Sequence, residues 1–285
     1  MTITTATEDF SAIVTVRLPT GNFDTSNFFS TTSTNNYSPI DEFLTNAVSL
    51  NMLWVTNEDE ISNQLANLLL LGYVSAVESY MRSMIRSLIN IDLFVQKKCE
   101  SLQVSYTAAM HHTKFLLPEA LLEETVFSGK DKITTSLNKF LDMSKLTGSL
   151  GVLLDRYESI CQMRHCCVHR FGKLGVKNAI ALGLEGHKSL IEKPVILNRS
   201  DLSQIADSLF SLVKSINNEV FAHVLQRFIG PNKTNFTWSW DYGTDKVIFN
   251  KYYKIFQTKE DAIKSPTALT LYIRFKNTKA PQNRR

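Results

Sequence analysis

One short run of the chain collects residues that can move protons and bind negative charge. Residues 164–169 read Arg-His-Cys-Cys-Val-His, so that Arg164, His165 and His169 stand close together in the sequence. Histidine exchanges protons near neutral pH and suits general acid or base work. Arginine stays charged and offers a planar fork of donors to phosphate oxygens. RNA supplies its own nucleophile, the 2′-OH, so an imidazole and a cation suffice to cleave it without a metal.

The spacing of this run sets a geometric demand. Arg164 and His169 are five residues apart, which places them about 140° apart around a regular helix. They can act together only if the helix ends there or if a second subunit contributes one of them. Gly172 and Gly175 follow the run and favour a helix end.

Two other interpretations of the same residues stay open. Cys161, His165 and His169 lie at i, i+4 and i+8, and all three are possible zinc ligands. One straight stripe cannot surround an ion and the chain has no CxxC pair, so we expect no metal and no cofactor. Alternatively the run is structural, with a histidine favoured at a helix C-terminus and Arg164 paired with a carboxylate.

Composition describes an ordinary globular chain with an uneven charge. Of 285 residues, 44% are hydrophobic and 20% charged, and the four cysteines do not form a disulfide pattern. The start of the chain lacks a secretory signal and no apolar stretch could span a membrane, so we expect a cytoplasmic protein. Residues 231–285 carry 11 Lys and Arg against 4 Asp and Glu, which indicates either a polyanionic partner or a solvated tail.

The patterns between these features predict a mainly α protein. Helical spacing of apolar residues predicts helices at 39–54, 133–143 and 150–168. It also predicts a helix of about 35 residues that begins at a cap at Asn57, and a last helix that begins at Asn198 or Ser200. Alternating residues predict strands at 12–18, 236–242, 247–256 and 269–275. Trp238, Trp240 and Tyr242 would then stack bases or fill a core. We expect an irregular N-terminal segment (1–56), a helical bundle (57–230) and a basic β-rich appendage (231–285).

The run 164–169 and its setting resemble the HEPN superfamily, helical domains that include many metal-independent ribonucleases. The shared signature is an arginine, often a polar residue next, then three residues and a histidine, here Arg164, His165 and His169. The long preceding helix, with an acidic residue at Glu78, also looks like the family's early helix. The resemblance covers about residues 57–230, whereas 1–56 and 231–285 lie outside it.

The resemblance implies a role for each of these residues. Two copies would form a homodimer in which the two motifs face one cleft. Arg164 would bind or polarise the scissile phosphate, His169 would act as general base or acid for 2′-OH attack, and His165 would orient the site or bind phosphate. Glu78 would hold Arg164 or a histidine in place. The basic stretch after the motif, with Arg170 and Lys173, would contact RNA.

The resemblance also implies a function and its alternative. It indicates an endoribonuclease that serves as a bacterial toxin or antiviral RNase, with an antitoxin or regulatory chain as a possible partner. The alternative is a catalytically silent HEPN module that binds RNA or a partner protein. Some family members carry a tyrosine two residues after the histidine. This chain has Phe171 there and so does not belong to that subtype.

Overall fold

The computed structural model describes residues 13–16, 19, 21–32, 37–56, 60–229 and 236–281. Within these ranges every regular element is a helix, and the β-type pairing is a single isolated bridge between Lys173 and Pro194. The mainly α class predicted from the sequence is therefore confirmed. The chain divides into two compact units, residues 1–36 and 37–285, which are described separately.

The first unit contains one short 3-10 helix, η1 (Thr25–Phe28). It begins after Asp24, whose carboxylate accepts a hydrogen bond of 3.0 Å from the Ser26 backbone. The strand expected at 12–18 is wrong for residues 13–16, which form no strand and pair with no other described segment; residues 12, 17 and 18 lie outside the described ranges. Their β-branched pattern alone cannot supply the neighbouring strand that backbone pairing needs.

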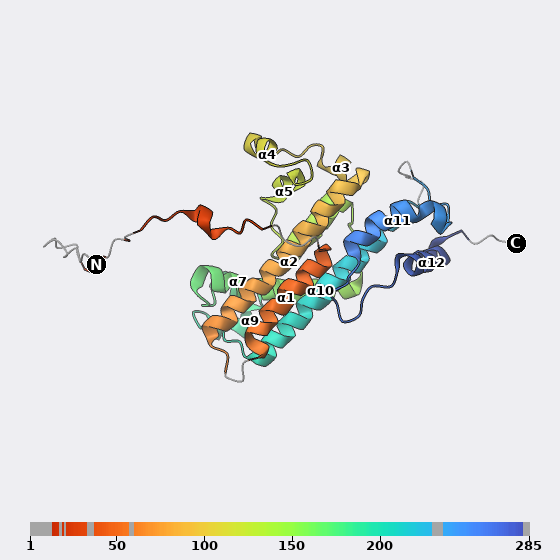
Figure 1. Ribbon diagram of the computed structural model, residues 1–285. Helices are drawn as coiled ribbons and strands as arrows, with labels where there is room; N and C mark the ends of the chain where they lie inside the picture. Colours follow the sequence, from red (N-terminus) through yellow and green to blue (C-terminus); the bar gives the residue numbers. More distant parts are fainter. Residues whose placement is uncertain are drawn as a thin grey trace. The chain divides into compact units, whose positions relative to one another are not determined.

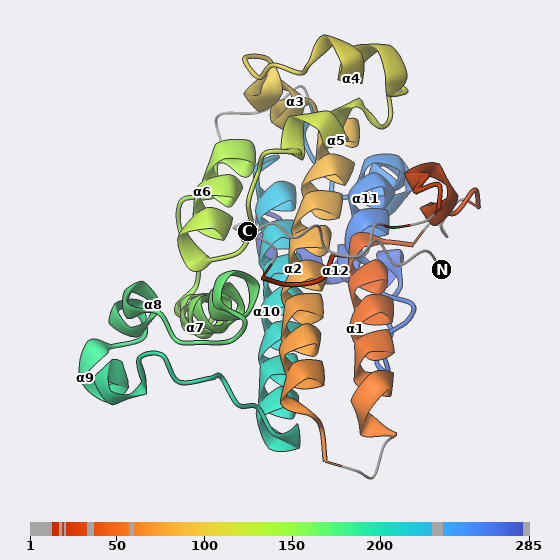
Figure 2. The ribbon, with the colours of Figure 1, turned by 90° about the vertical axis from the view of Figure 1, so that its left-hand side faces the viewer.

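Three long helices form the centre of the second unit. α1 (Pro39–Val55), α2 (Asn63–Ile91) and α10 (Arg199–Gln226) lie side by side in both views of the ribbon (Figures 1 and 2) and pack on one another. Apolar residues at helical spacing are fully buried between them, including Val77, Met84, Leu88, Leu212, Ile216 and Val220. This burial of one face per helix drives the arrangement.

A fourth helix crosses this group. α7 (Gly148–Arg170) is seen close to end-on in Figure 2, where α2 and α10 run up the view. It packs on α10 and α2 through the buried residues Leu150, Leu154 and Tyr157. The shorter α6 (Lys130–Leu141) packs beside it. The helices expected at 39–54, 133–143 and 150–168 are thus confirmed to within a few residues.

Helix starts follow the capping side chains. Asn198 and Asp201 form a complete capping box at the start of α10, so the predicted cap is confirmed. α2 instead begins after Ser62, whose hydroxyl accepts from the Leu65 backbone at 3.2 Å. It has 29 residues and not about 35. Asn57, the expected cap, lies outside the described residues.

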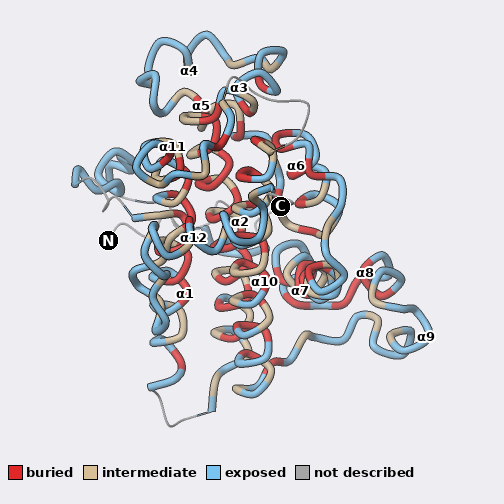
Figure 3. Tube along the Cα trace, turned by 90° about the vertical axis from the view of Figure 1, so that its right-hand side faces the viewer, coloured by how far each residue is buried: buried red, intermediate tan, exposed pale blue. Residues whose placement is uncertain are grey.

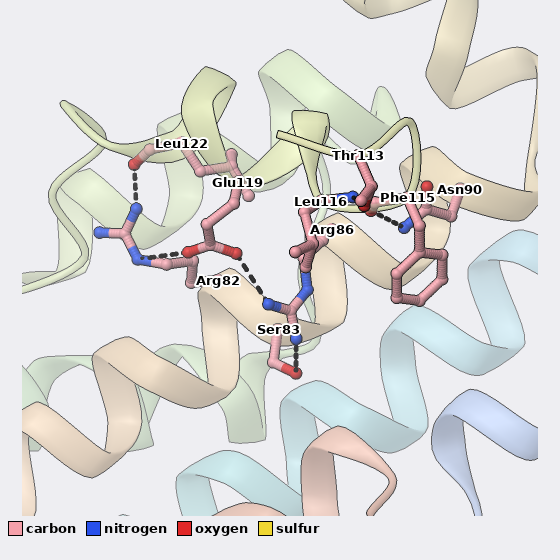
Figure 4. Close-up of polar contacts among 9 residues, drawn as sticks. All are labelled: Arg82, Ser83, Arg86, Asn90, Thr113, Phe115, Leu116, Glu119 and Leu122. Carbon is pink, nitrogen blue, oxygen red and sulfur yellow. Dashed lines mark hydrogen bonds and ion pairs between the residues drawn. The ribbon is translucent and has the colours of Figure 1, made fainter. Parts of the chain in front are cut away.

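The segment between α2 and α6 holds three short helices, and a polar network joins it to α2. These helices are α3 (Leu93–Cys99), α4 (Tyr106–His111) and α5 (Leu117–Leu122). In Figure 4, Glu119 of α5 lies between Arg82 and Arg86 of α2, with Arg86 Nη1 2.9 Å from its carboxylate. Arg82 also donates to the backbone oxygens of Leu122 and Thr125. The Arg82 guanidinium therefore satisfies carbonyls at and just after the end of α5, whereas Arg86 pairs with Glu119.

The C-terminal β appendage expected from the sequence is wrong. Residues 242–256 form α11 (Tyr242–Phe256) and residues 268–279 form α12 (Ala268–Lys279). Residues 236–239 belong to no regular element and pair with no described strand. Residues 243–245 belong to the first turn of α11, where the Asp241 carboxylate accepts a hydrogen bond of 2.9 Å from the Thr244 backbone.

An aromatic cluster explains why alternation was misleading. Trp238 is only 3% exposed and packs on Phe228, Phe249, Tyr272 and Phe275. Its Nε1 donates to the Leu225 backbone at 3.2 Å. The alternating residues 236–240 are therefore a loop whose large side chains fill a gap between helices. Of the two interpretations left open for these aromatics, the buried core is the correct one for Trp238.

The expected boundaries after residues 56 and 230 do not separate compact units either. α1 packs on α2, and its buried Asp41 accepts hydrogen bonds from the Thr258 hydroxyl at 2.6 Å and the Lys259 and Glu260 backbones at 3.0–3.1 Å. Asp41 is only 3% exposed. α11 in turn packs on α10 and α2. Residues on both sides of the expected boundaries thus share one core with the middle of the chain.

After α7 the chain makes a small excursion. It holds α8 (Val176–Ala181), α9 (Leu184–His187) and the 3-10 helix η2 (Lys188–Leu190), and Figure 3 shows it largely exposed beside α7. Leu174 exchanges backbone hydrogen bonds of 2.9 Å with Lys193 and Glu192. The Val195 backbone donates to Gly172 at 2.8 Å. These bonds close a neck between residues 172–174 and 192–195.

Candidate active site

The motif run occupies the last two turns of α7. Thr147 caps the start of this helix, and Phe171 ends it in the left-handed conformation, with φ of 51°. The Gly172 backbone then donates to the Cys166 carbonyl at 3.1 Å, which closes the final turn. The helix end that the sequence predicted is therefore present, one residue beyond His169.

The helix is unbroken between Arg164 and His169. Residues 164–169 all lie within α7, so these two side chains point about 140° apart from one helix. The structure does not bring Arg164 and His169 together within one chain. The helix end comes too late to change their directions, which leaves only the second of the two sequence-based solutions, a contribution from another subunit.

His165 and His169 do meet. Four residues apart, they share one exposed face, with ring centroids 4.3 Å apart and planes inclined at 50°. The pKa of His165 lies below its ordinary value of 6.5, first because of burial and then because of the positive charges of His169, Arg164 and Lys177. At neutral pH His165 is therefore held in its neutral, proton-accepting form.

Arg164 lies on a different side of α7, where it is partly buried. Among the described residues it forms no hydrogen bond and no ion pair. Glu78 of α2 is nearby, since the charges of Glu78 and Arg164 both act on the pKa values of Tyr157 and Cys161, in opposite directions. The described contacts contain no bond between Glu78 and Arg164, so the expected holding role of Glu78 is not seen within one chain.

Burial shapes the chemistry of the cysteines around the motif, Cys161, Cys166 and Cys167. All are buried, and burial is the main cause that raises the pKa of the Cys161 thiol to about 12 and that of Cys167 to about 11. A thiol that stays protonated is a poor nucleophile and a poor metal ligand. No three His, Cys, Asp or Glu side chains among the described residues gather as a metal site.

The two basic residues after the motif, Arg170 and Lys173, differ in whether their charge is paired. Arg170 forms an ion pair with Glu192 across the neck of the excursion, and its side chain lies against Gly175, whose added Cβ would meet Arg170 Nη1 at 3.0 Å. Lys173 is exposed and forms no ion pair with a described carboxylate. Of the two expected RNA-binding residues, only Lys173 has an unengaged charge.

A series of linked hydrogen bonds beside the histidines was not predicted from the sequence. Buried Asn178 of α8 donates to the Gln162 side chain at 2.8 Å, Gln162 donates to Glu158 at 2.7 Å, and Glu158 accepts from the Lys130 backbone at 2.8 Å. The i, i+4 spacing of Glu158 and Gln162 is a usable sequence signal. The approach of Asn178 is not, because it depends on how α8 folds back.

A pocket at the junction of α2 and α7 was also missed. It has a volume of about 370 Å³ and lies between the first turns of α2 and the last turn of α7. Asn63 and Asn67 of α2 and Cys167 and Phe171 of α7 contribute to its lining. Residues about a hundred positions apart in the chain form it, so no local spacing could indicate it.

Comparison of the chain with protein-family models, with curated proteins and with solved structures gave no match. Across the described residues, none of the helices combines the length and the apolar character that crossing a membrane requires.

Proposed function

We propose that this protein is a metal-independent endoribonuclease of the HEPN type, which cleaves RNA through attack of the 2′-OH on the adjacent phosphate. One observation carries the proposal. Arg164 forms no ion pair with a described residue, and its charge acts on His165, an imidazole with a lowered pKa whose ring lies 4.3 Å from that of His169. An unpaired cation beside a neutral histidine is a suitable set for phosphoryl transfer.

The proposed step balances without a cofactor. A neutral imidazole, His165 or His169, removes the 2′-OH proton as the 2′ oxygen bonds to phosphorus. Arg164 donates to the non-bridging oxygens, on which negative charge builds up. The bond from phosphorus to the 5′ oxygen breaks, and a protonated imidazole gives that oxygen its proton. The products are a 2′,3′-cyclic phosphate and a 5′-OH end.

The divergence of Arg164 and His169 leads to a homodimer with composite sites. In a two-fold dimer, Arg164 of one copy can face His169 of the other. Val168 and Phe171 beside the motif are 46% and 88% exposed, and apolar side chains at a helix end are suitable for burial against a partner. The proposal therefore assigns Arg164 and His169 of different chains to the same phosphate.

Cleavage in EDTA is the first test. We expect the purified protein to cut single-stranded RNA in the chelator and to leave cyclic phosphate ends, and His169→Ala to lose at least about a hundredfold in rate. His111→Ala, which changes an exposed histidine at the end of α4, is the matched control and should keep full activity. A rate that needs added metal, or that survives His169→Ala, would falsify the proposal.

Mixing two inactive variants tests the composite site. Arg164→Ala and His169→Ala dimers, unfolded together and refolded, should regain roughly a quarter of wild-type activity, because half of the dimers carry one intact site of two. A site made by a single chain would regain nothing. That result would reject the composite geometry while leaving the proposed transesterification standing.

A catalytically silent RNA-binding module is the second candidate. One observation favours it, a set of exposed cations on α11 and α12 without ion pairs to described carboxylates: Lys246, Lys251, Lys254, Arg274, Lys276 and Lys279. It predicts RNA binding without cleavage, weakened by Lys→Gln changes in this set. Removal of residues 231–285 would be a poor test, because α11 packs on α10 and α2.

The cellular role follows from the proposed chemistry. We infer an RNase that acts in the cytoplasm as a toxin or in antiviral defence, with RNA as substrate and an antitoxin or regulatory chain as partner. The four free, buried cysteines are compatible with a reducing compartment. Growth arrest on expression of the wild type, but not of His169→Ala, would support this role.

A further inference from the structure

The excursion after α7 carries one lysine that lies beside the histidine pair. Lys177, the second residue of α8, is exposed, and its side chain forms no ion pair or hydrogen bond with a described residue. Its positive charge is nevertheless one of those that lower the pKa of His165. Exposed charges are largely screened from each other beyond about 10 Å, so the ammonium group lies close to the His165 ring.

Buried contacts hold α8 in this position on α7 (Figure 2). The residue after the lysine, Asn178, is only 5% exposed, and its Nδ2 donates to the Gln162 side chain at 2.8 Å. Gln162 lies one helical turn before His165 on α7. Ala179 in turn packs on Cys166 in a small apolar cluster, and both are fully buried. The backbone that carries the lysine is therefore fixed to α7 beside the histidines.

The charge of Lys177 is not neutralised within the described part of the chain. Two other cations of this region are paired, Lys188 with Glu185 at 2.7 Å and Arg170 with Glu192. Lys177 has no such carboxylate, and positive charge without a counter-ion attracts polyanions. An RNA strand carries one phosphate per nucleotide. A cation close to the histidines is therefore placed to meet the phosphate next to the one that they attack.

We propose that Lys177 binds the phosphate that flanks the scissile one, so that the site engages two consecutive phosphates of the RNA strand. Lys177 belongs to the chain that contributes the histidines, and it touches no reacting atom. Its role is to bind and position the strand, and a substrate with a single phosphate leaves it unused. The inference rests on the proposed ribonuclease function for the identity of the ligand, and it adds a minimum length for the substrate.

Two substrates of different length test the contact. At about pH 8, well above the ordinary pKa of histidine, Lys177→Gln should raise KM for an RNA oligonucleotide about tenfold and change kcat less than about twofold. A dinucleoside monophosphate contains only the phosphate that is attacked, so the variant should cleave it with the kcat/KM of the wild type. An equal loss on both substrates would show that Lys177 acts through the histidines or the fold, and would overturn the proposal.

Two further variants control for charge and for fold. Lys177→Arg keeps the positive charge and should return KM for the oligonucleotide to within about twofold of the wild type. Lys193→Gln removes another exposed lysine of the excursion, one whose charge is not among those that act on His165, and should leave KM unchanged. The melting temperatures of all three variants should match that of the wild type, because both lysines are exposed. No recovery in Lys177→Arg, or an equal rise of KM in Lys193→Gln, would refute the contact.

Binding without cleavage separates this inference from the proposed function. An oligonucleotide with 2′-O-methyl groups has no free 2′-OH and cannot be cut by the proposed step. Its binding to the full chain, followed by fluorescence anisotropy at several salt concentrations, should lose about 0.7 from the slope of log K against log salt in Lys177→Gln. An unchanged slope rejects the contact and leaves the ribonuclease standing. A reduced slope in a protein that does not cleave RNA would retain the phosphate contact and reject the ribonuclease.

Discussion

Two partly buried arginines, Arg82 on α2 and Arg164 on α7, have opposite surroundings. Arg82 lies within 3.7 Å of Glu119, donates to two backbone carbonyls and covers the Phe127 ring. Arg164 forms no hydrogen bond or ion pair with any described residue, and its charge contributes to the lowered pKa of His165. A guanidinium with satisfied donors holds the fold together, whereas one with unused donors is available to an anionic ligand. We therefore propose a structural role for Arg82 and a ligand-binding role for Arg164, and three predictions follow.

The largest effect should follow from Arg164. Arg164→Ala should lower kcat/KM for RNA cleavage about 100- to 1,000-fold, because the charge that builds up on phosphate loses its donors. Arg164→Lys should recover only part, since an ammonium cannot reproduce the planar fork. Arg86→Ala on α2 is the matched control, because Arg86 pairs with the same Glu119 as Arg82. A control variant that loses as much activity as Arg164→Ala would remove the contrast.

For stability we expect the larger effect from Arg82 and not from Arg164. Arg82→Ala should lower the free energy of unfolding by about 2–3 kcal/mol, because Leu122 and Thr125 lose the donor to their carbonyls. Arg164→Ala should stay within about 0.5 kcal/mol of the wild type. Urea unfolding followed by circular dichroism measures both. Equal losses in the two variants would mean that Arg164 is structural after all.

The smallest effect concerns pH. Because the pKa of His165 is lowered, its neutral form persists below pH 6.5, and the acidic limb of kcat/KM should lie below that value. Lys177 contributes to this lowering, so Lys177→Gln should raise the pKa and move the limb to higher pH by less than about one unit. Lys193→Gln, whose residue is not among the causes of the shift, should leave the limb in place. A limb that moves downward in Lys177→Gln would contradict His165 as the proton acceptor.

The same lowered pKa has a consequence for folding. The unfolded chain takes up the proton at His165 before the folded chain does, so stability should fall as the pH drops below about 6.5. His223 is shifted in the same direction by burial and adds to this loss. Acid sensitivity of the fold and the acidic limb of activity therefore overlap, and activity should be measured where the protein is still folded.

Sequence patterns predicted those parts of the fold that local physics determines. α7 and α10 were predictable because their buried residues repeat at helical spacing and Asn198 caps the latter. In α11 the same signal was present, since Phe249, Tyr252 and Phe256 also follow helical spacing. The alternation of residues 236–242 obscured it. That alternation comes from loop residues filling a cluster built by distant helices, which no local window contains.

In the candidate site, too, the features that depend on local spacing could be predicted, and those that depend on distant segments could not. The divergence of Arg164 and His169 followed from the rotation of 100° per residue, and the structure bears out the unbroken helix. The meeting of the His165 and His169 rings follows from i, i+4 spacing. Lys177, Asn178 and the pocket at Asn63 and Asn67 could not be predicted, because each depends on a segment folding back to α7 across many residues.

The closed neck after α7 has a consequence for how this protein could diversify. Hydrogen bonds of Gly172 and Leu174 with residues 192–195 fix both ends of the excursion independently of what lies between them. α8 packs on α7, but residues 183–190 are mostly exposed and are therefore a place where evolution or an engineer could insert, shorten or replace chain without moving the end of α7. A fluorescent label or a whole guest domain placed there would report on the motif from a neighbouring but mechanically separate position.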